Sequence, residues 1–272
     1  MSANVPDEEA ALAEKLRGFD TSVPSPARMW NYWVGGKDHF AADRKAGDAL
    51  IAAYPAMVTL VRANRAFLGR AVRFLAEEAG IRQFLDIGTG IPAAGSTHQV
   101  AQEAAPDSRI VYVDYDPIVL AHARALLISG PEGAADYIDA DARDVDTILE
   151  KAALTLDFSQ PVAVLSLLML HAVSDDDHPH QIISAIMDAL PEGSYLAMSH
   201  PASDIEQERA TAITASVNPL SYQQYTARSR EQVLRFFDGM ELVEPGLVQV
   251  QLWRPAAESV GTLSLWAAVG RK

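Results

Sequence analysis

The sequence has 272 residues, 49% of them hydrophobic, which is enough to build one large α/β domain. Its 36 acidic and 22 basic residues give a net charge of −14, so nucleic acid is not an expected partner. The absence of cysteine excludes disulfides, thiolate nucleophiles and cysteine-ligated metals. No apolar run is long enough to cross a membrane, and Asp7, Glu8 and Glu9 are acidic where a signal peptide is basic. These features predict a cytoplasmic protein with no membrane partner.

The N-terminal part of the chain predicts helices. Residues 24–40 (PSPARMWNYWVGGKDHF) combine aromatic, basic and glycine residues, with Gly35 and Gly36 able to supply a bend. Residues 41–79 are rich in alanine, leucine and arginine, and their apolar residues recur at helical spacing, for example at Phe67 and Val72. We therefore expect residues 1–80 to form a helical extension or lid, and residues 81–272 to form the main domain.

From Gln83 onward, short apolar runs alternate with helix-sized segments, which is typical of a parallel sheet. The runs are 83–87, 109–114, 135–139, 161–168 and 194–199. The last two runs, 240–252 and 262–269, are separated by too few residues for a crossover helix and should pair antiparallel. The sequence thus predicts an α/β fold with a mostly parallel sheet that ends in an antiparallel hairpin.

A glycine turn follows the first predicted strand in residues 84–92 (FLDIGTGIP). Asp86 precedes Gly88 and Gly90, and a helix is expected from about Ser96. Glycines at such a position let a ligand approach the backbone at the head of a helix. Asp114 ends the next strand, where a carboxylate can accept both hydroxyls of a ribose, and Tyr115 follows it.

The charge near this turn distinguishes between nucleoside cofactors. The nicotinamide fingerprint has a third glycine where this sequence has Ala93. Asp86 would repel a pyrophosphate, at a cost on the order of 1 kcal/mol or more. The same carboxylate favours the ammonium and sulfonium groups of S-adenosylmethionine, which is therefore the expected cofactor.

A third acidic segment, residues 137–144 (YIDADARD), follows the third predicted strand. Asp141 could accept a hydrogen bond from the adenine amino group while the Ala142 amide contacts the ring edge, with Asp139 and Asp144 as alternatives. The alternative for each aspartate is a helix cap or a turn residue. Asp116 is expected to cap the helix that Pro117 begins.

Several of these motifs resemble those of known enzymes. D-I-G-T-G (86–90), V-Y-V-D-Y-D-P-I-V-L-A-H-A-R (111–124) and Y-x-D-A-D-x-R-D (137–144) are similar to class I S-adenosylmethionine-dependent methyltransferases. P-x-P-A-R-x-W-N-Y-W-x-G-G-K-D-x-F-A-A-D-R (24–44) and N-R-x-F-L-x-R-A-V-R (64–73) resemble one bacterial S-adenosyl methyltransferase family, formerly catalogued as a domain of unknown function. The resemblance implies a Rossmann-like fold of seven strands in the order 3-2-1-4-5-7-6, the last antiparallel. Residues 93–95 depart from the expected polar stretch.

The predicted lid would close over the cofactor at the carboxyl edge of the sheet. Arg28 or Arg65 could pair with the cofactor carboxylate, and aromatic faces could lie near the sulfonium. Tyr32, Lys37 and Asp38 are the other expected contacts. Trp30 and Trp33 are expected mainly to pack the lid onto the domain.

Methyl transfer requires alignment of the acceptor and, where the acceptor carries one, removal of a proton. The candidate bases are His171 and His200, which follow the fourth and fifth strands, and then His39; a structural role is the alternative for each. The acidic and histidine-containing run 174–180 is better explained as a polar loop with an aspartate that caps helix 179–190 than as a metal site.

The resulting hypothesis is an S-adenosylmethionine-dependent methyltransferase with a small-molecule acceptor. Two alternatives are a non-catalytic protein that senses S-adenosylmethionine or S-adenosylhomocysteine, and a nicotinamide-dependent oxidoreductase. Residues 201–228 are expected to line the acceptor pocket, with Tyr222 and Tyr225 as candidate contacts. A monomer and a homodimer are equally consistent with the sequence.

Overall fold

A mixed sheet of eight strands forms the centre of the computed structural model, which describes residues 20–126, 130, 132–217, 225–257 and 261–272. The strand order is β3-β2-β1-β4-β5-β8-β6, and β7 also pairs with β8. The strands are β1 (Gln83–Ile87), β2 (Arg109–Asp114), β3 (Ala134–Asp139), β4 (Ala163–Leu167), β5 (Tyr195–Pro201), β6 (Glu241–Leu242), β7 (Val248–Gln249) and β8 (Leu265–Arg271).

This topology confirms the predicted sheet. Strands β1 to β5 are parallel, and β8 is inserted antiparallel between β5 and β6. The single strand predicted over 240–252 is wrong: the segment contains the short strands β6 and β7, followed by a 3₁₀ turn at Val250–Leu252. Pro245 and Gly246 lie between the two strands, and a proline cannot donate a ladder hydrogen bond.

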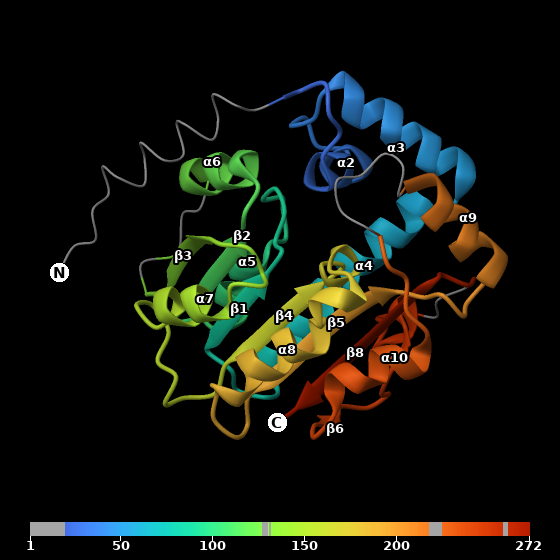
Figure 1. Ribbon diagram of the computed structural model, residues 1–272. Helices are drawn as coiled ribbons and strands as arrows, with labels where there is room; N and C mark the ends of the chain where they lie inside the picture. The colour runs from blue at the N-terminus through green and yellow to red at the C-terminus, as the bar shows by residue number, and fades with distance from the viewer. Residues whose placement is uncertain (1–19, 127–129, 131, 218–224, 258–260) are drawn as a thin grey trace.

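Helices cover both faces of the sheet (Figure 1). Helices α4 (Met57–Glu77) and α5 (Thr97–Ala104) share a core with Phe84 and the side chains on the same face of the neighbouring strands. Helices α7 (Val145–Ala152), α8 (Pro179–Asp188) and α10 (Arg230–Leu234) cover the opposite face, where Leu85 and Ile87 are buried. Successive strand residues thus enter opposite cores, as a sheet covered on both faces requires. Helix α6 (Pro117–Leu126) packs beside β3.

The remaining helices lie beyond one end of the sheet (Figure 1). Helices α2 (Pro26–Trp33) and α3 (Ala41–Ala53) pack on each other, and α9 (Gln207–Val217) packs on α3. The helical prediction for 41–79 is confirmed as two helices, α3 and α4, separated at Pro55. Trp33, Leu50 and Val61 form a small core that joins α2 and α3 to α4. Because α4 also packs on the sheet, it connects these N-terminal helices to the main layers.

Candidate active site

A cavity of about 310 Å³ lies along the carboxyl ends of β1 to β5, between the sheet and helices α2 to α4. The structure brings most of the predicted site residues together on its wall. These are Arg65, Asp86, Gly88, Gly90, Asp114, Tyr115, Asp141, Ala142 and His171. They come from segments far apart in the chain, and the parallel sheet gathers them because its strands end at a common edge.

The two glycines of the turn after β1 have different reasons to be glycine. Gly88 has a φ of +74°, and a Cβ built on it would lie 2.2 Å from Cγ of Met169. Gly90 has a φ of +67°, but a Cβ there would meet no atom within 4 Å. Gly88 is therefore required by the close approach of Met169, whereas Gly90 leaves open space on the cavity wall.

Asp114 ties the end of β2 to this turn. Its carboxylate accepts hydrogen bonds from the backbone amides of Gly90 (2.9 Å), Tyr115 (2.9 Å) and Asp116 (3.0 Å). Burial raises the pKa of Asp114 to about 6, although these hydrogen bonds act in the opposite direction. Oδ1 already accepts two of these hydrogen bonds and Oδ2 accepts one, so Oδ2 retains acceptor capacity for a further donor from the cavity.

Asp86 is a second buried carboxylate on the same wall. Its Oδ2 accepts a hydrogen bond of 2.6 Å from the Thr97 hydroxyl. Burial raises the pKa of Asp86 to about 6; the Thr97 hydrogen bond and the Arg65 charge lower it, and the Asp114 charge raises it. Arg65 itself donates to the carbonyl oxygens of Ala93 (2.9 Å) and Ala94 (3.0 Å) and so holds the loop after the turn. The sequence reasoning missed Thr97, which is a common residue type without a distinctive spacing.

The third acidic segment is arranged by Arg143, another residue that the sequence reasoning missed. The Arg143 side chain donates to both carboxylate oxygens of Asp141, at 2.9 and 2.6 Å, and this interaction lowers the pKa of Asp141. Asp144 caps α7 by accepting from the Thr147 amide at 3.3 Å, as its alternative reading predicted. Asp116 accepts from the Ile118 amide at 2.8 Å, which confirms it as the cap of α6.

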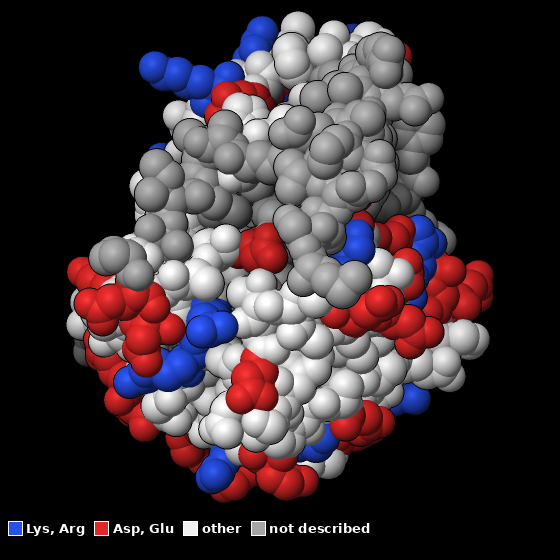
Figure 2. All heavy atoms as spheres, turned by 90° about the vertical axis from the view of Figure 1, so that its left-hand side faces the viewer, with Lys and Arg blue, Asp and Glu red and all other residues white. Residues whose placement is uncertain are grey.

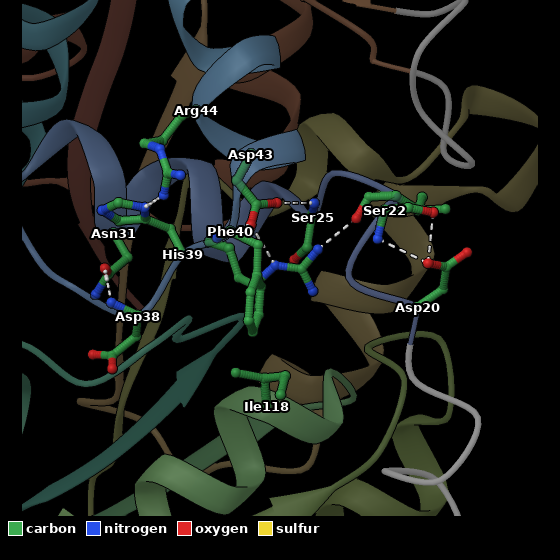
Figure 3. Close-up of polar contacts among 12 residues, drawn as sticks. Asp20, Ser22, Ser25, Asn31, Asp38, His39, Phe40, Asp43, Arg44 and Ile118 are labelled. Atoms are coloured by element: carbon green, nitrogen blue, oxygen red, sulfur yellow. Dashed lines mark hydrogen bonds and ion pairs between the residues drawn. The ribbon is translucent and has the colours of Figure 1, made fainter.

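Arg28 lies outside the cavity wall, contrary to the prediction. Its side chain is buried and pairs with Asp43, the Nε–Oδ2 distance being 2.8 Å. Asp43 also accepts from the backbone amides of Ser25 and Phe40, toward which it points in Figure 3. A buried carboxylate on α3 therefore turns the guanidinium away from the cavity, since a buried charge requires a partner.

Tyr32, Lys37 and Asp38 are also absent from the cavity wall. The Tyr32 hydroxyl donates to Asp48 at 2.7 Å, Lys37 is exposed, and the Asp38 carboxylate lies 3.6 Å from Nε2 of His122 on α6. His39 is absent from the wall too; in Figure 3 it lies beside Arg44, whose Nη1 is 3.2 Å from Nδ1 of His39. The structure thus does not bring Tyr32, Lys37 or Asp38 to the cavity wall, and cofactor contacts at these positions stay predictions.

The N-terminal helices present their apolar side to the cavity instead. Met29, Trp30 and Trp33 line it, together with Pro24 before α2 and Pro26 at its start. The Ser25 hydroxyl donates to the Asp116 carboxylate at 2.8 Å, which attaches the start of α2 to the end of β2. The tryptophans thus have the packing role that was expected of them and also form part of the wall.

His171 lies on the wall just after β4, in a 3₁₀ turn at Leu170–Ala172. Burial and, to a smaller extent, the Arg228 charge lower the pKa of His171 to about 4. The imidazole is therefore neutral at pH 7. Its Nδ1 is buried and has no hydrogen-bond partner within the described part of the chain. Leu168, at the end of β4, has a φ of +51°, a conformation that leucine rarely adopts and that is often found near functional sites.

His200 does not reach the cavity, and its predicted role as a base is therefore wrong. It is fully buried, its Nε2 lies 2.8 Å from Nη1 of Arg228, and its Nδ1 lies 3.0 Å from the Pro201 carbonyl oxygen. Arg228 also donates to the Leu170 and Val173 carbonyls and pairs with Asp175 at 2.7 Å. Together these contacts fasten the segment that carries His171 to the end of β5.

The run 174–180 contributes to this attachment through Asp175. Within the described ranges, no group of three or more histidine, aspartate and glutamate side chains is placed to hold a metal ion. The predicted aspartate cap of the following helix is wrong, because α8 begins at Pro179 and its N-cap residue is His178, whose side chain makes no capping hydrogen bond.

The raised pKa values predict how cofactor binding depends on pH. Ionised Asp86 and Asp114 attract a cationic ligand, and their ionised fractions rise as the pH increases through about 6. We expect the Kd of S-adenosylmethionine to fall about tenfold or more between pH 5 and pH 7. Isothermal titration at several pH values measures this change; a Kd that is constant over the range, or that rises, would contradict the assignment. Asp86→Asn should make the dependence shallower.

The mostly parallel sheet with its antiparallel β8, and the carboxylate-lined glycine turn, define a Rossmann-like methyltransferase fold. A family profile described as S-adenosyl methyltransferase matches residues 12–272, and the chain belongs to this family. The activity of this family is S-adenosylmethionine-dependent methyl transfer. The alternative prediction of a nicotinamide-dependent oxidoreductase is therefore wrong.

Two solved structures are similar over most of the chain. One is a DUF574 family protein of Streptomyces avermitilis, with 42% identity, a TM-score of 0.90, and coverage of 93% of this chain and 99% of that chain. The other is described as a methyltransferase of Thermobifida fusca, with 41% identity, a TM-score of 0.85, and coverage of 93% and 96%. No curated protein matches the sequence. None of the helices in the described ranges has the length and apolar character to span a membrane.

Proposed function

We propose that the protein transfers the methyl group of S-adenosylmethionine to a small molecule bound in the same cavity. The observation that supports this most directly is the continuity of the cavity. Its wall runs from Asp86 and Asp114 at one end, past His171, to apolar side chains of α3 and α9 at the other. Cofactor and acceptor can thus meet in one continuous space.

The charged end suits the cofactor chemically. Asp86 would face the ammonium group, and Oδ2 of Asp114 would accept from a ribose hydroxyl. Asp141 and Ala142 follow β3, next to β2 in the sheet, and would contact the adenine. Arg65 holds the adjoining loop and lies on the wall, where it would pair with the cofactor carboxylate. Two buried carboxylates at this end favour a cation over a pyrophosphate.

His171 would act on the acceptor. The cofactor supplies a methyl group on a sulfonium, so that a bond from the acceptor heteroatom to the methyl carbon forms as the carbon–sulfur bond breaks and leaves its electron pair on sulfur. An acceptor oxygen that gains a methyl group while it still holds its proton becomes a far stronger acid than imidazolium. A neutral His171 can therefore take that proton despite its lowered pKa, through the unpartnered Nδ1.

The proposal is tested by labelling. The protein is incubated with methyl-labelled S-adenosylmethionine and a bacterial extract that has been separated into small-molecule and macromolecular fractions. We expect label in a small molecule, accompanied by S-adenosylhomocysteine. Label confined to macromolecules would contradict the proposed acceptor size. Tight binding of S-adenosylmethionine with no transfer to any fraction would favour the sensor alternative.

A substitution separates the role of His171 from a structural one. With the labelled acceptor as substrate, His171→Asn should lower kcat about 100-fold, because the proton acceptor is lost. The Kd of S-adenosylmethionine should change less than twofold, since the histidine follows β4 whereas the cofactor residues follow β1 to β3. The matched control is His180→Asn, on α8 and outside the cavity wall, which should retain kcat. A kcat loss equal in both variants would contradict the assignment.

The other expectations about partners rest on charge and composition. Acidic and basic side chains are interspersed over the described part of the face in Figure 2. A net charge of −14 disfavours nucleic acid as the acceptor, which supports a small molecule. We propose a cytoplasmic location on the same composition, and a monomer and a homodimer both remain predictions.

A further inference from the structure

The end of the cavity away from the cofactor residues forms a chamber with mostly apolar walls. We call it the apolar chamber; Trp30, Leu50, Leu60, Ala210, Ile213 and Leu265 are among its lining residues. They come from α2, α3, α4, α9 and β8, so the chamber lies between the N-terminal helices and the β5 side of the sheet. Tyr225 also lines it, as expected of the segment 201–228, whereas Tyr222 lies outside the described residues.

Charge is distributed unevenly along the cavity. Its charged lining residues are Arg65, Asp86, Asp114, Asp116, Asp141 and Arg143. They lie on α4, at the carboxyl ends of β1 and β2, and in the segments after β2 and β3, which is the cofactor end. The described walls of the apolar chamber include no aspartate, glutamate, lysine or arginine. A charged ligand placed there would lose its hydration without gaining a counter-ion, which costs several kcal/mol.

The chamber nevertheless contains buried polar atoms. The Tyr54 side chain has no exposed surface, and its hydroxyl has no hydrogen-bond partner within the described part of the chain. Burial, and after it the nearby Tyr54, raises the pKa of Tyr225, and the Tyr225 ring is 5.1 Å from the His171 ring. Two atoms that a ligand could satisfy, the Tyr54 hydroxyl and Nδ1 of His171, therefore belong to side chains that are both near Tyr225. Buried polar groups are rarely left without a partner.

The aromatic side chains in the walls favour a ligand with flat rings. Trp30, Trp33, Tyr54 and Tyr225 supply aromatic surface, and Met57 supplies a flexible thioether. Aromatic side chains pack well on the faces and edges of rings, and methionine adapts to irregular apolar shapes.

We propose that the methyl acceptor is an uncharged, ring-bearing molecule that carries a hydroxyl group, with its rings in the apolar chamber and its hydroxyl hydrogen-bonded beside Tyr54 and His171. This inference rests on the proposed function, since it describes the acceptor of the same site. It excludes amino acids, carboxylates, phosphates and cationic amines as acceptors.

The test uses three probes of similar size at pH 7.5: 1-naphthol, which is neutral, 1-naphthoate, an anion, and 1-naphthylmethylammonium, a cation. Each is titrated into the protein saturated with S-adenosylhomocysteine, whose own binding is measured first. We expect 1-naphthol to bind at least about tenfold more tightly than either charged probe.

Variants locate the binding. Ala46 on α3 lines the cavity, and Ala46→Phe should weaken 1-naphthol at least about tenfold by filling the chamber. Ala49→Phe, on an exposed position of the same helix, is the matched control and should have no effect. Tyr54→Phe should weaken 1-naphthol about fivefold through loss of one hydrogen bond, without lowering the melting temperature.

The outcomes are distinguishable. Equal or tighter binding of a charged probe overturns the inference, as does binding of S-adenosylhomocysteine with no binding of 1-naphthol. Equal effects of Ala46→Phe and Ala49→Phe would show that the probe binds elsewhere, which would also overturn the inference. An unchanged affinity for 1-naphthol in Tyr54→Phe would overturn the proposed hydrogen bond. Failure of S-adenosylhomocysteine to bind would instead overturn the proposed function itself.

Discussion

Asp114→Ala is expected to weaken binding of S-adenosylmethionine about 100-fold. The free acceptor position on Oδ2 would accept a ribose hydroxyl, and a hydrogen bond to a charged acceptor contributes about 1.5–3 kcal/mol. The substitution also removes the acceptor that holds the Gly90 amide in the turn, so the turn loses its link to β2. Isothermal titration with the purified variant measures the effect.

The matched control for this variant is Asp136→Ala. Asp136 lies on β3, the strand next to β2, is exposed, and does not line the cavity. Its removal should leave the Kd within about twofold of the wild-type value, as is typical of surface substitutions. If both variants bound S-adenosylmethionine as tightly as the wild type, Asp114 would have a purely structural role. Circular dichroism must show that both variants are folded.

Gly88→Ala is expected to lower the free energy of unfolding by about 2–5 kcal/mol. An alanine at a φ of +74° costs about 1–2 kcal/mol, and overpacking against Met169 adds about 1–3 kcal/mol. Gly90→Ala should cost only the backbone contribution, because its Cβ would meet no neighbouring atom. Urea denaturation followed by circular dichroism compares the two variants.

A double-mutant cycle identifies the cause of the loss. Combining Gly88→Ala with Met169→Ala removes Cγ, the atom nearest the new Cβ, and leaves the Met169 Cβ at 2.6 Å, so part of the destabilisation should be recovered relative to Met169→Ala alone. Strict additivity of the two substitutions would show that the contact between the turn and Met169 is not responsible. Equal destabilisation by Gly88→Ala and Gly90→Ala would lead to the same conclusion.

Much of the sheet could be predicted because its signals are local. The buried strands are short apolar runs bounded by polar residues, and the few residues between the last two runs allowed only an antiparallel pairing. Pro245 was the local signal against one long strand over 240–252, and it was overlooked. Residue type and spacing are therefore sufficient to predict a strand where that strand is buried on both faces.

The positions of candidate site residues were predictable only where strand ends and glycine turns determine them. Strand ends and glycine turns converge at one sheet edge whatever the distant sequence contains, which is why Asp86 and Asp114 could be predicted to lie together on the cavity wall. The orientation of Arg28 depends on Asp43, fifteen residues later, and that of His200 depends on Arg228. Such long-range pairings produce no repeating pattern of residue types in a single sequence. The left-handed backbone of Leu168 likewise has no signal in its residue type.

We propose that the carboxylate-lined end of the cavity binds S-adenosylmethionine. Isothermal titration of the wild-type protein measures this binding. S-adenosylmethionine and S-adenosylhomocysteine are titrated at pH 7.5, with NADH as the control for a pyrophosphate-containing nucleotide. We expect binding of the first two at micromolar concentrations and no heat from NADH, because Asp86 and Asp114 favour a cation. Binding of NADH, with none of either S-adenosyl ligand, would contradict the account.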